Sequence, residues 1–261
     1  MTRDIKMVVT DLDGTYLRSD KSISAYTEQV MAKLRQAGIL FVVATARPVR
    51  AVRDFLPWVQ YDAGIFHNGA VVWNGAERIG GTGIEESQKI VQKITREKAG
   101  IHVAIEADDR LYANFDAQRI WPGIQYSSTV NFAELSGKVA DKLIIEAHSL
   151  EEMAQYRKYI PEHLYLQLSE NAIAMVMNRQ ATKTKGIQLL AGHFHISQEE
   201  IVAFGDDYND IDMLQSCGIG VAVGNALEEV KRSADRVCGS NDEDGVAHWL
   251  SENLDIPVCR N

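Results

Sequence analysis

Residues 7–15 read MVVTDLDGT, a short β-branched run that ends on two aspartates and a glycine. The run predicts a buried strand over residues 7–10. In a parallel sheet the carboxyl ends of the strands open onto the crevice where ligands bind, so we expect Asp11 and Asp13 at a binding site. Side chains alternate along a strand, and the two carboxylates converge only if the chain turns after Asp11, which Gly14 makes possible.

A βαβ unit follows from the next segment. Residues 39–44 form a second apolar run that stops at Thr45, and Ser24 and Gly38 can begin and end the helix between the two strands. The last third of the chain repeats the alternation, with strands predicted at 201–204 and 220–223 and helices at 187–194, 210–217 and around 226–233. This pattern predicts an α/β fold with a Rossmann-like parallel sheet.

The middle of the chain has a different pattern. Residues 71–75 and residues 101–114 read as hairpins, and strand-like runs recur at 143–145, 165–168 and 172–177. Ser149 and Glu152 stand at capping-box spacing and predict a helix start. We therefore expect an α+β domain at residues 81–181, inserted into a core made of residues 1–80 and 182–261.

Composition limits the possible partners. The 261 residues are 46% hydrophobic and carry a formal net charge of −9, so no broad positive field is available for nucleic acid or for an anionic membrane surface. Cys217, Cys238 and Cys259 form no CxxC pair, which predicts neither a disulfide framework nor a zinc site and suits the cytoplasm. No signal peptide or membrane span is expected, and no protein partner is indicated.

A second acidic motif, GDDYND at residues 205–210, follows the strand predicted at 201–204. Magnesium requires hard oxygen ligands, so Asp11, Asp13 and Asp206 form a credible magnesium set, to which we add Asp210. Helix N-capping alone would account for Asp207 and Asp212. A bare DxD is as often a solvated Asp-Gly turn as a site.

Two further segments could contact phosphate. Thr45-Ala46-Arg47 follows the second strand, where a hydroxyl and backbone N–H groups can hold phosphate oxygens, although an ordinary helix cap is the simpler interpretation. Residues 182–186, TKTKG, precede a predicted helix and supply positive charge, although a lysine pair is usually solvated.

Taken together and in this order, the four segments resemble the haloacid dehalogenase superfamily: DxDGT, a Thr after the second strand, a Lys before a later helix, and GDxxND. The position of the insert, Asn68-Gly69-Ala70 and residues 224–226 and 242–246 are similar to the Cof-type sugar-phosphatase branch. One departure is visible, because Ala46 stands where related chains usually have glycine.

The resemblance implies a magnesium-dependent phosphatase that acts on a small phosphorylated metabolite, with sugar phosphates favoured. It implies that Asp11 is the nucleophile and Asp13 the general acid and base. The other implied roles are phosphate binding by Thr45, Ala46, Lys183 and Asn209, and Mg²⁺ binding by Asp11, Asp13, Asp206 and Asp210. The family places its lysine either directly before a glycine or three positions before one, which favours Lys183 and leaves Lys185 as the alternative.

Two other functions stay open from the sequence. A phosphomutase can use the same aspartyl phosphate and return the phosphoryl group to a sugar. A receiver-like regulator keeps its aspartate phosphorylated, and Asp13 argues against that, because a second carboxylate would speed dephosphorylation. Residues of the insert that could contact the leaving portion of a substrate are Arg119, Trp121, Tyr126 and His148.

Overall fold

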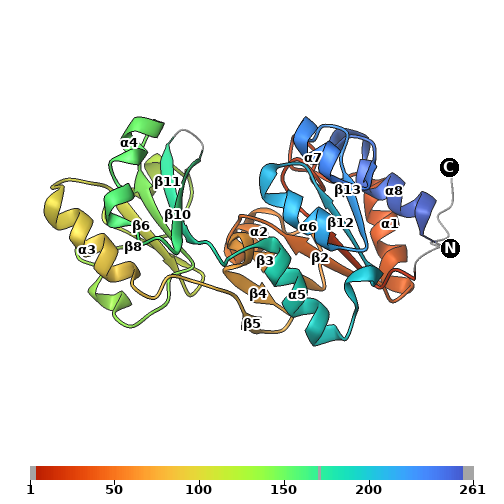
Figure 1. The fold of residues 1–261 in the computed structure, drawn as a ribbon, viewed down its shortest axis with the longest axis horizontal. Helices are drawn as coiled ribbons and strands as arrows, with labels where there is room; N and C mark the ends of the chain where they lie inside the picture. The colour runs from red at the N-terminus through yellow and green to blue at the C-terminus, as the bar shows by residue number, and fades with distance from the viewer. Residues whose placement is uncertain (1–3, 170–171, 255–261) are drawn as a thin grey trace. The chain divides into compact units, whose positions relative to one another are not determined.

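Two compact units make up the computed structural model, which describes residues 4–169 and 172–254. One unit runs from the N-terminal segment to Gly81 and resumes at Thr182, and the other spans Thr82–Ala181. Each unit has its own sheet with helices packed against it (Figure 1). The chain leaves the first unit once and returns to it once.

The first unit contains an eight-stranded sheet in the order β14-β13-β12-β1-β2-β3-β4-β5. Neighbours are parallel from β14 to β3, and β3, β4 and β5 pair antiparallel. The bounds are β1 (Met7–Thr10), β2 (Leu40–Ala44), β3 (Ala63–Phe66), β4 (Val71–Trp73), β5 (Arg78–Gly80), β12 (Ile201–Gly205), β13 (Ile219–Ala222) and β14 (Arg236–Val237). Strand β1 lies between β12 and β2, so the first and last thirds of the chain meet at the centre of the sheet.

Both faces of this sheet are covered. All four side chains of β1 are 0% exposed, and successive side chains of a strand point to opposite faces. Helix α1 packs beside α8, and α5 packs beside α6 (Figure 1). The helices are α1 (Ala25–Gln36), α2 (Val49–Phe55), α5 (Lys183–Phe194), α6 (Ile211–Ser216), α7 (Glu228–Ser233) and α8 (Gly245–Asn253). The predicted α/β class is confirmed.

Local signals place α1 as expected. The Ser24 side chain accepts a hydrogen bond from the backbone N–H of Thr27, and Val30, Met31 and Leu34 form the buried stripe of the helix. Gly38 then adopts a φ of +73°, which glycine reaches without steric cost.

Two helices of the last third differ from their predicted bounds. Helix α5 begins at Lys183 instead of residue 187, because the Thr182 side chain accepts from the backbone N–H of Lys185 and caps the helix earlier. The helix predicted at 210–217 is preceded by a 3₁₀ turn, Tyr208–Asp210, and α6 begins at Ile211. The first difference places Lys183 in the first turn of a helix.

The second unit contains a six-stranded sheet in the order β10-β11-β9-β6-β7-β8. The pairs are antiparallel except β7 with β8. Asp108 and Asp109 join β6 to β7 with φ values of 53° and 56°, the left-handed pair that a tight two-residue hairpin requires. The elements are α3 (Ser87–Glu97), β6 (Val103–Ala107), β7 (Arg110–Ala113), β8 (Ser127–Ser128), β9 (Lys142–Glu146), α4 (Leu150–Ala154), β10 (Leu164–Ser169) and β11 (Ile173–Asn178).

This second sheet also buries both faces. Ile90, Val91 and Ile94 of α3 belong to one core cluster with strand residues such as Ile105. A smaller cluster includes Ala104 and Ile144, and partly buried side chains pack against it, among them Ile120, Trp121, Ile124 and Tyr126. The unit therefore carries its own core.

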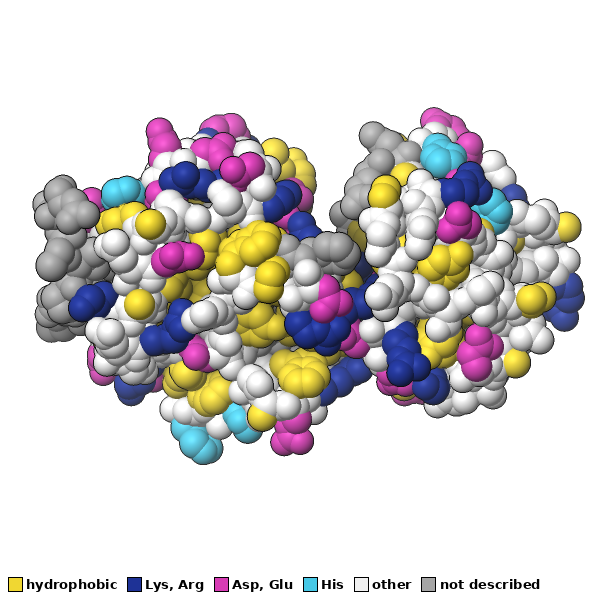
Figure 2. Space-filling model, turned by 180° about the vertical axis from the view of Figure 1, so that it is seen from behind, with side chains coloured by type: hydrophobic (Ala, Val, Ile, Leu, Met, Phe, Trp, Pro, Cys, Tyr) yellow, Lys and Arg dark blue, Asp and Glu magenta, His cyan; other side chains and the backbone are white. Residues whose placement is uncertain are grey.

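The surface carries charges of both signs. Figure 2 shows Lys and Arg side chains interspersed with Asp and Glu on the face that it presents. Across the described ranges, no helix combines the length and the hydrophobicity that crossing a bilayer requires. Cys217 and Cys238 are free thiols, and Cys259 lies outside the described residues.

Candidate active site

The turn after β1 delivers Asp11 to the carboxyl end of the sheet. The backbone N–H of Asp11 still bonds to the Phe204 carbonyl of β12 at 3.0 Å, and the chain then folds back, with Leu17 N–H bonding to Leu12 O at 2.9 Å. Gly14 has a φ of +85°, and a Cβ there would lie 2.6 Å from Oδ2 of Asp206. Glycine is needed both for the turn and for the approach of the second acidic motif.

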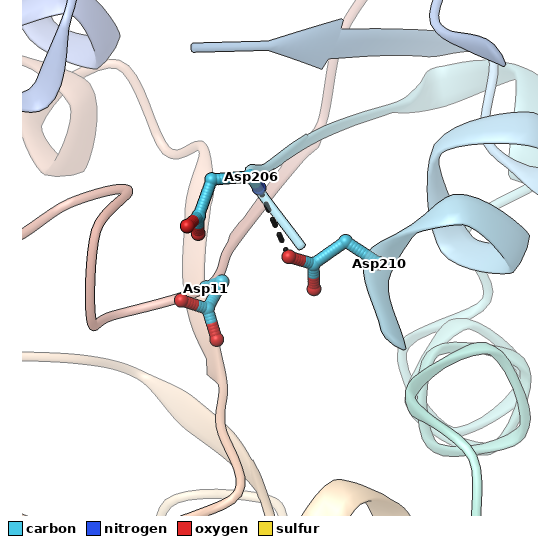
Figure 3. Close-up of side chains that lie close together, drawn as sticks. All are labelled: Asp11, Asp206 and Asp210. Carbon is cyan, nitrogen blue, oxygen red and sulfur yellow. Dashed lines mark hydrogen bonds between the residues drawn. The ribbon is translucent and has the colours of Figure 1, made fainter. Parts of the chain in front are cut away.

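Three carboxylates meet at this end of the sheet. Asp11, Asp206 and Asp210 each offer an oxygen atom, and these atoms lie within 4.8 Å of one another (Figure 3). Asp11 follows β1, and Asp206 follows the neighbouring strand β12. Buried carboxylates this close repel one another unless cations compensate them.

Lys183 supplies one compensating charge. Its Nζ lies 2.6 Å from Oδ1 of Asp11 and 2.6 Å from Oδ1 of Asp210, and its side chain is 1% exposed. Burial alone would lower the pKa of Lys183, but the two carboxylates outweigh it and raise the pKa above its usual value. Lys185 is exposed, so the structure brings Lys183 and not Lys185 to the carboxylates.

The charges of the centre fit a divalent cation. With every carboxylate ionised, the three carboxylates and one ammonium group carry −3 and +1, a formal charge of −2. Burial raises the pKa of Asp11, and Asp210 adds to this, while Lys183 opposes it. Burial also raises the pKa of Asp206 to about 6. Hard oxygen ligands whose full ionisation calls for a further cation match what Mg²⁺ binds.

Asp210 is occupied by the protein itself. Its Oδ2 accepts the backbone N–H groups of Asp206 at 3.0 Å and Asp207 at 3.1 Å, and its Oδ1 accepts from Lys183. Asp206 has one oxygen, Oδ1, held by the Thr15 hydroxyl at 2.5 Å. Asp210 therefore shapes the turn that presents Asp206, and Asp11 and Asp206 are the better placed of the three to offer oxygens to a cation.

Asp13 is engaged outside this cluster. Its carboxylate accepts from Arg47 Nε at 2.6 Å and Nη2 at 2.7 Å, and Lys21 Nζ lies 2.8 Å away. Burial would raise the pKa of Asp13, but the hydrogen bonds from Arg47 and Lys21 lower it to about 2. The side chain is held as a carboxylate by two cations.

Thr45 and Ala46 stand at the end of β2, next to β1 in the sheet. The Thr45 side chain is buried, and its Oγ1 accepts the backbone N–H of Arg47 at 3.1 Å. The hydroxyl hydrogen of Thr45 is left to donate, which is the capacity that a phosphate ligand needs.

Asn209 lies on the 3₁₀ turn after Asp206. Its Nδ2 donates to Oδ1 of Asn68 at 3.2 Å, and Asn68 is 8% exposed. Asp207 caps the same turn by accepting the N–H of Tyr208 at 2.7 Å, as the capping interpretation predicted. Asp212 is exposed in the first turn of α6.

The candidate residues of the insert lie in the second unit. Arg119 and His148 approach Oε1 of Glu146 at 3.8 and 3.3 Å. Trp121 packs against the smaller core cluster, and Tyr126 donates its hydroxyl to Asp116 at 3.3 Å. Arg119 and His148 are therefore gathered by a glutamate that sequence reasoning did not single out.

Sequence reasoning also missed four partners of the site: Thr15, Lys21, Arg47 and Asn68. Thr15, Arg47 and Asn68 stand inside quoted motifs, DLDGT, TAR and NGA, which was the available signal. Lys21 carried none, because it lies in an irregular segment with a φ of 68°.

Comparison with known proteins tests the family resemblance that the motifs indicate. Residues 8–250 match the model of the family described as haloacid dehalogenase-like hydrolase. A 5-amino-6-(5-phospho-D-ribitylamino)uracil phosphatase of Bacillus subtilis is 27% identical over 96% of this chain and 98% of its own length. A pyridoxal phosphate phosphatase of Escherichia coli is 26% identical over 95% of this chain and 98% of its own.

The fold is also similar to that of a solved structure. A sugar phosphatase of HAD subclass IIB is 29% identical, with a TM-score of 0.76 over 95% of this chain and 98% of its own. The resemblance deduced from the motifs, with its Cof-type branch and its phosphatase class, is confirmed by these similarities.

Proposed function

The chain belongs to the haloacid dehalogenase-like hydrolases, and from this membership we propose that it is a magnesium-dependent phosphatase for a small metabolite that works through an aspartyl phosphate on Asp11. The observation that carries the proposal is the buried Lys183 between Asp11 and Asp210, with Asp206 beside them. A formal surplus of two negative charges at the ends of two adjacent strands is costly to bury without a further cation. It suits a cation and a phosphate.

Electrostatics sets what the site must overcome. At roughly 4 Å and an effective dielectric of about 20, each pair of unit charges repels by about 4 kcal/mol, so Asp11 alone would not approach a phosphate dianion. Bound Mg²⁺ would be held by oxygens of Asp11 and Asp206 and would supply the positive charge that stabilises the phosphoryl oxygens. Lys183 is already in contact with Asp11, and there it can donate to a phosphoryl oxygen in the transition state.

Asp11 Oδ attacks phosphorus, the bond to the leaving oxygen breaks, and the phosphoryl group is carried on Asp11 until water hydrolyses it. Thr45 and Asn209 would donate hydrogen bonds to the phosphoryl oxygens, with the backbone at Ala46 beside them. These roles follow from the ends of β2 and β12, which flank β1.

We assign the proton transfers to Asp13. It would protonate the leaving oxygen and then take the proton of the attacking water. Arg47 and Lys21 now hold Asp13 as a carboxylate. Phosphate oxygens offer Arg47 the same bidentate partner geometry as the carboxylate, so substrate binding can exchange the guanidinium from Asp13 to phosphate. Asp13 is then free to take up a proton from water before it donates that proton to the leaving oxygen.

The substrate is proposed as a small phosphorylated metabolite. Relatives named for sugar phosphate, pyridoxal phosphate and a ribityl-uracil phosphate support this class, and the sugar phosphatase has the highest identity of the three. We propose that residues 81–181 form the domain that discriminates among such substrates, and that residues 1–80 and 182–261 form the catalytic core.

The test is a phosphatase assay on purified protein with p-nitrophenyl phosphate and Mg²⁺. We expect hydrolysis that EDTA abolishes and Mg²⁺ restores, and an Asp11→Asn variant that still unfolds cooperatively but has no activity. Full activity in EDTA or in Asp11→Asn would exclude the mechanism. A sugar phosphate assayed alongside distinguishes free phosphate release from an isomerised product, and the latter would indicate a phosphomutase.

A further inference from the structure

We propose that Asn68 is a positioning residue, which orients Asn209 toward the phosphate. Asn68 lies in a turn that also contacts the Thr45 loop and the start of α5. The inference rests on the proposed function. The turn consists of His67, Asn68 and Gly69 and follows β3, and neither the nucleophile nor the metal site includes it.

The turn is conformationally costly. His67 and Asn68 have φ values of 48° and 53°, so two successive non-glycine residues occupy the left-handed region, and Gly69 follows at 109°. All three are buried. A buried left-handed pair persists only where surrounding contacts determine it, and such pairs gather at functional sites.

Hydrogen bonds tie the turn to the phosphate-binding loop. The backbone N–H of Asn68 donates to the carbonyl of Thr45 at 3.0 Å, and that of His67 donates to the carbonyl of Arg47 at 3.1 Å. The Thr45–Ala46 and Arg47–Pro48 peptide groups are thereby held by the turn.

Close packing ties the same turn to Lys183. A Cβ on Gly69 would lie 2.3 Å from the carbonyl oxygen of Thr182, the residue that caps α5. The backbone of the turn therefore contacts the backbone at the helix start, and Lys183 is the first residue of that helix.

The side chain of Asn68 connects the turn to a third proposed phosphate-binding residue, Asn209. Its Oδ1 accepts from Nδ2 of Asn209, which gives the Asn209 amide one favoured orientation and leaves its second N–H hydrogen to donate elsewhere. An amide without this partner can flip and present its oxygen to the phosphate. Asn68 thus acts through Asn209, while the backbone of the turn contacts the end of β2 and the start of α5.

Asn68→Gly separates positioning from folding. Glycine adopts a φ of +53° without strain, so the variant keeps the turn and loses only the amide. His195→Gly is the matched control, because His195 has a φ of 56° and is exposed at the end of α5.

Steady-state kinetics with p-nitrophenyl phosphate and saturating Mg²⁺ test the inference. We expect Asn68→Gly to lower kcat/KM by about tenfold, because a misoriented Asn209 amide loses its charge-assisted hydrogen bond to the phosphate. The melting temperature should not fall. His195→Gly should match the wild type. In an Asn209→Ala background, Asn68→Gly should cause no further loss, because its effect passes through Asn209.

Asn68→Asp is the second variant. It keeps the acceptor oxygens and tolerates the left-handed backbone, so its kcat should stay within about threefold of the wild type while its added charge raises KM. Wild-type kinetics in Asn68→Gly, or losses that add with those of Asn209→Ala, would overturn the inference and leave the proposed function standing. A wild-type protein without phosphatase activity would overturn both.

Discussion

Each unit of the molecule contains a charge cluster, in which one charged side chain contacts two others. The partners carry the opposite charge or, where they are histidines, carry it when protonated. In the first unit Lys183 bridges Asp11 and Asp210, and these side chains are 1%, 10% and 0% exposed. In the second unit Glu146 bonds to His102 and lies near His148, with exposures of 17%, 35% and 59%. The two clusters have a similar arrangement of contacts, but the side chains of the second are more exposed to solvent.

Burial decides what such a centre does to the protein. In a dry interior the removal of one partner leaves an uncompensated charge, whereas exposed pairs are screened by water and salt. The centre at Lys183 therefore has strict requirements for charge, which is what binding a cation and a phosphate demands. The centre at Glu146 can gain or lose a partner at low cost.

The largest effect is expected from Lys183→Met, which removes the only ammonium group that contacts Asp11 among the described residues. We expect kcat/KM to fall by about 10³-fold or more and the free energy of unfolding to fall by about 3 kcal/mol, because Asp11 and Asp210 are left facing each other. Phosphatase kinetics and urea unfolding measure the two quantities.

Lys185→Met is the control for that variant. Lys185 is exposed two residues away, so both quantities should stay close to the wild type, within about 0.5 kcal/mol for stability. If Lys185→Met lost activity and Lys183→Met kept it, the alternative spacing of the family lysine would be the right one.

A smaller effect is expected from Asp210→Asn. One amide oxygen can serve either Lys183 or the backbone N–H groups of Asp206 and Asp207, but not all three. We expect a loss of about 2 kcal/mol in stability and about 10²-fold in kcat. Asp212→Asn, at an exposed position of α6, should change neither, and equal effects in the two variants would contradict the assigned role.

The smallest effect is expected in the second unit, from Glu146→Gln. Exposed ion pairs contribute about 0.2–1 kcal/mol, so the urea midpoint should move only slightly at pH 7. Burial would raise the pKa of Glu146, but His102 and Arg119 lower it below the usual value of 4.5. A lowered folded-state pKa contributes stability above pH 4.5 that is lost as the pH falls, so the difference between wild type and variant should shrink on acidification.

The salt dependence of stability should distinguish the two charge clusters. Raising ionic strength should narrow the gap between wild type and Glu146→Gln, and it should leave the penalty of Lys183→Met largely unchanged, because buried charges are poorly screened. A salt-insensitive Glu146 would mean that the two centres do not differ in the way their exposures imply.

Local chemistry explains the elements that sequence reasoning placed correctly. The strand at Met7–Thr10 is signalled by a local apolar run, and the Ser24 cap and the Asp108-Asp109 hairpin follow from interactions within a few residues. Helix α5 was predicted to start too late, because its apolar stripe begins at Ile187 while the Thr182 cap begins the helix one turn earlier. The early start is what turns Lys183 inward.

The sequence by itself determined the carboxylates at the ends of β1 and β12, since an apolar run followed by acidic residues and glycine is a local pattern. Tertiary structure alone decided which charges meet. Lys183 and Asp11 are 172 residues apart, and they touch because β12 lies next to β1 and α5 packs where its first turn reaches that edge. Arg47 on Asp13 and Asn68 on Asn209 have the same origin: contacts between distant segments depend on the order of strands in the sheet, which no local window of sequence contains.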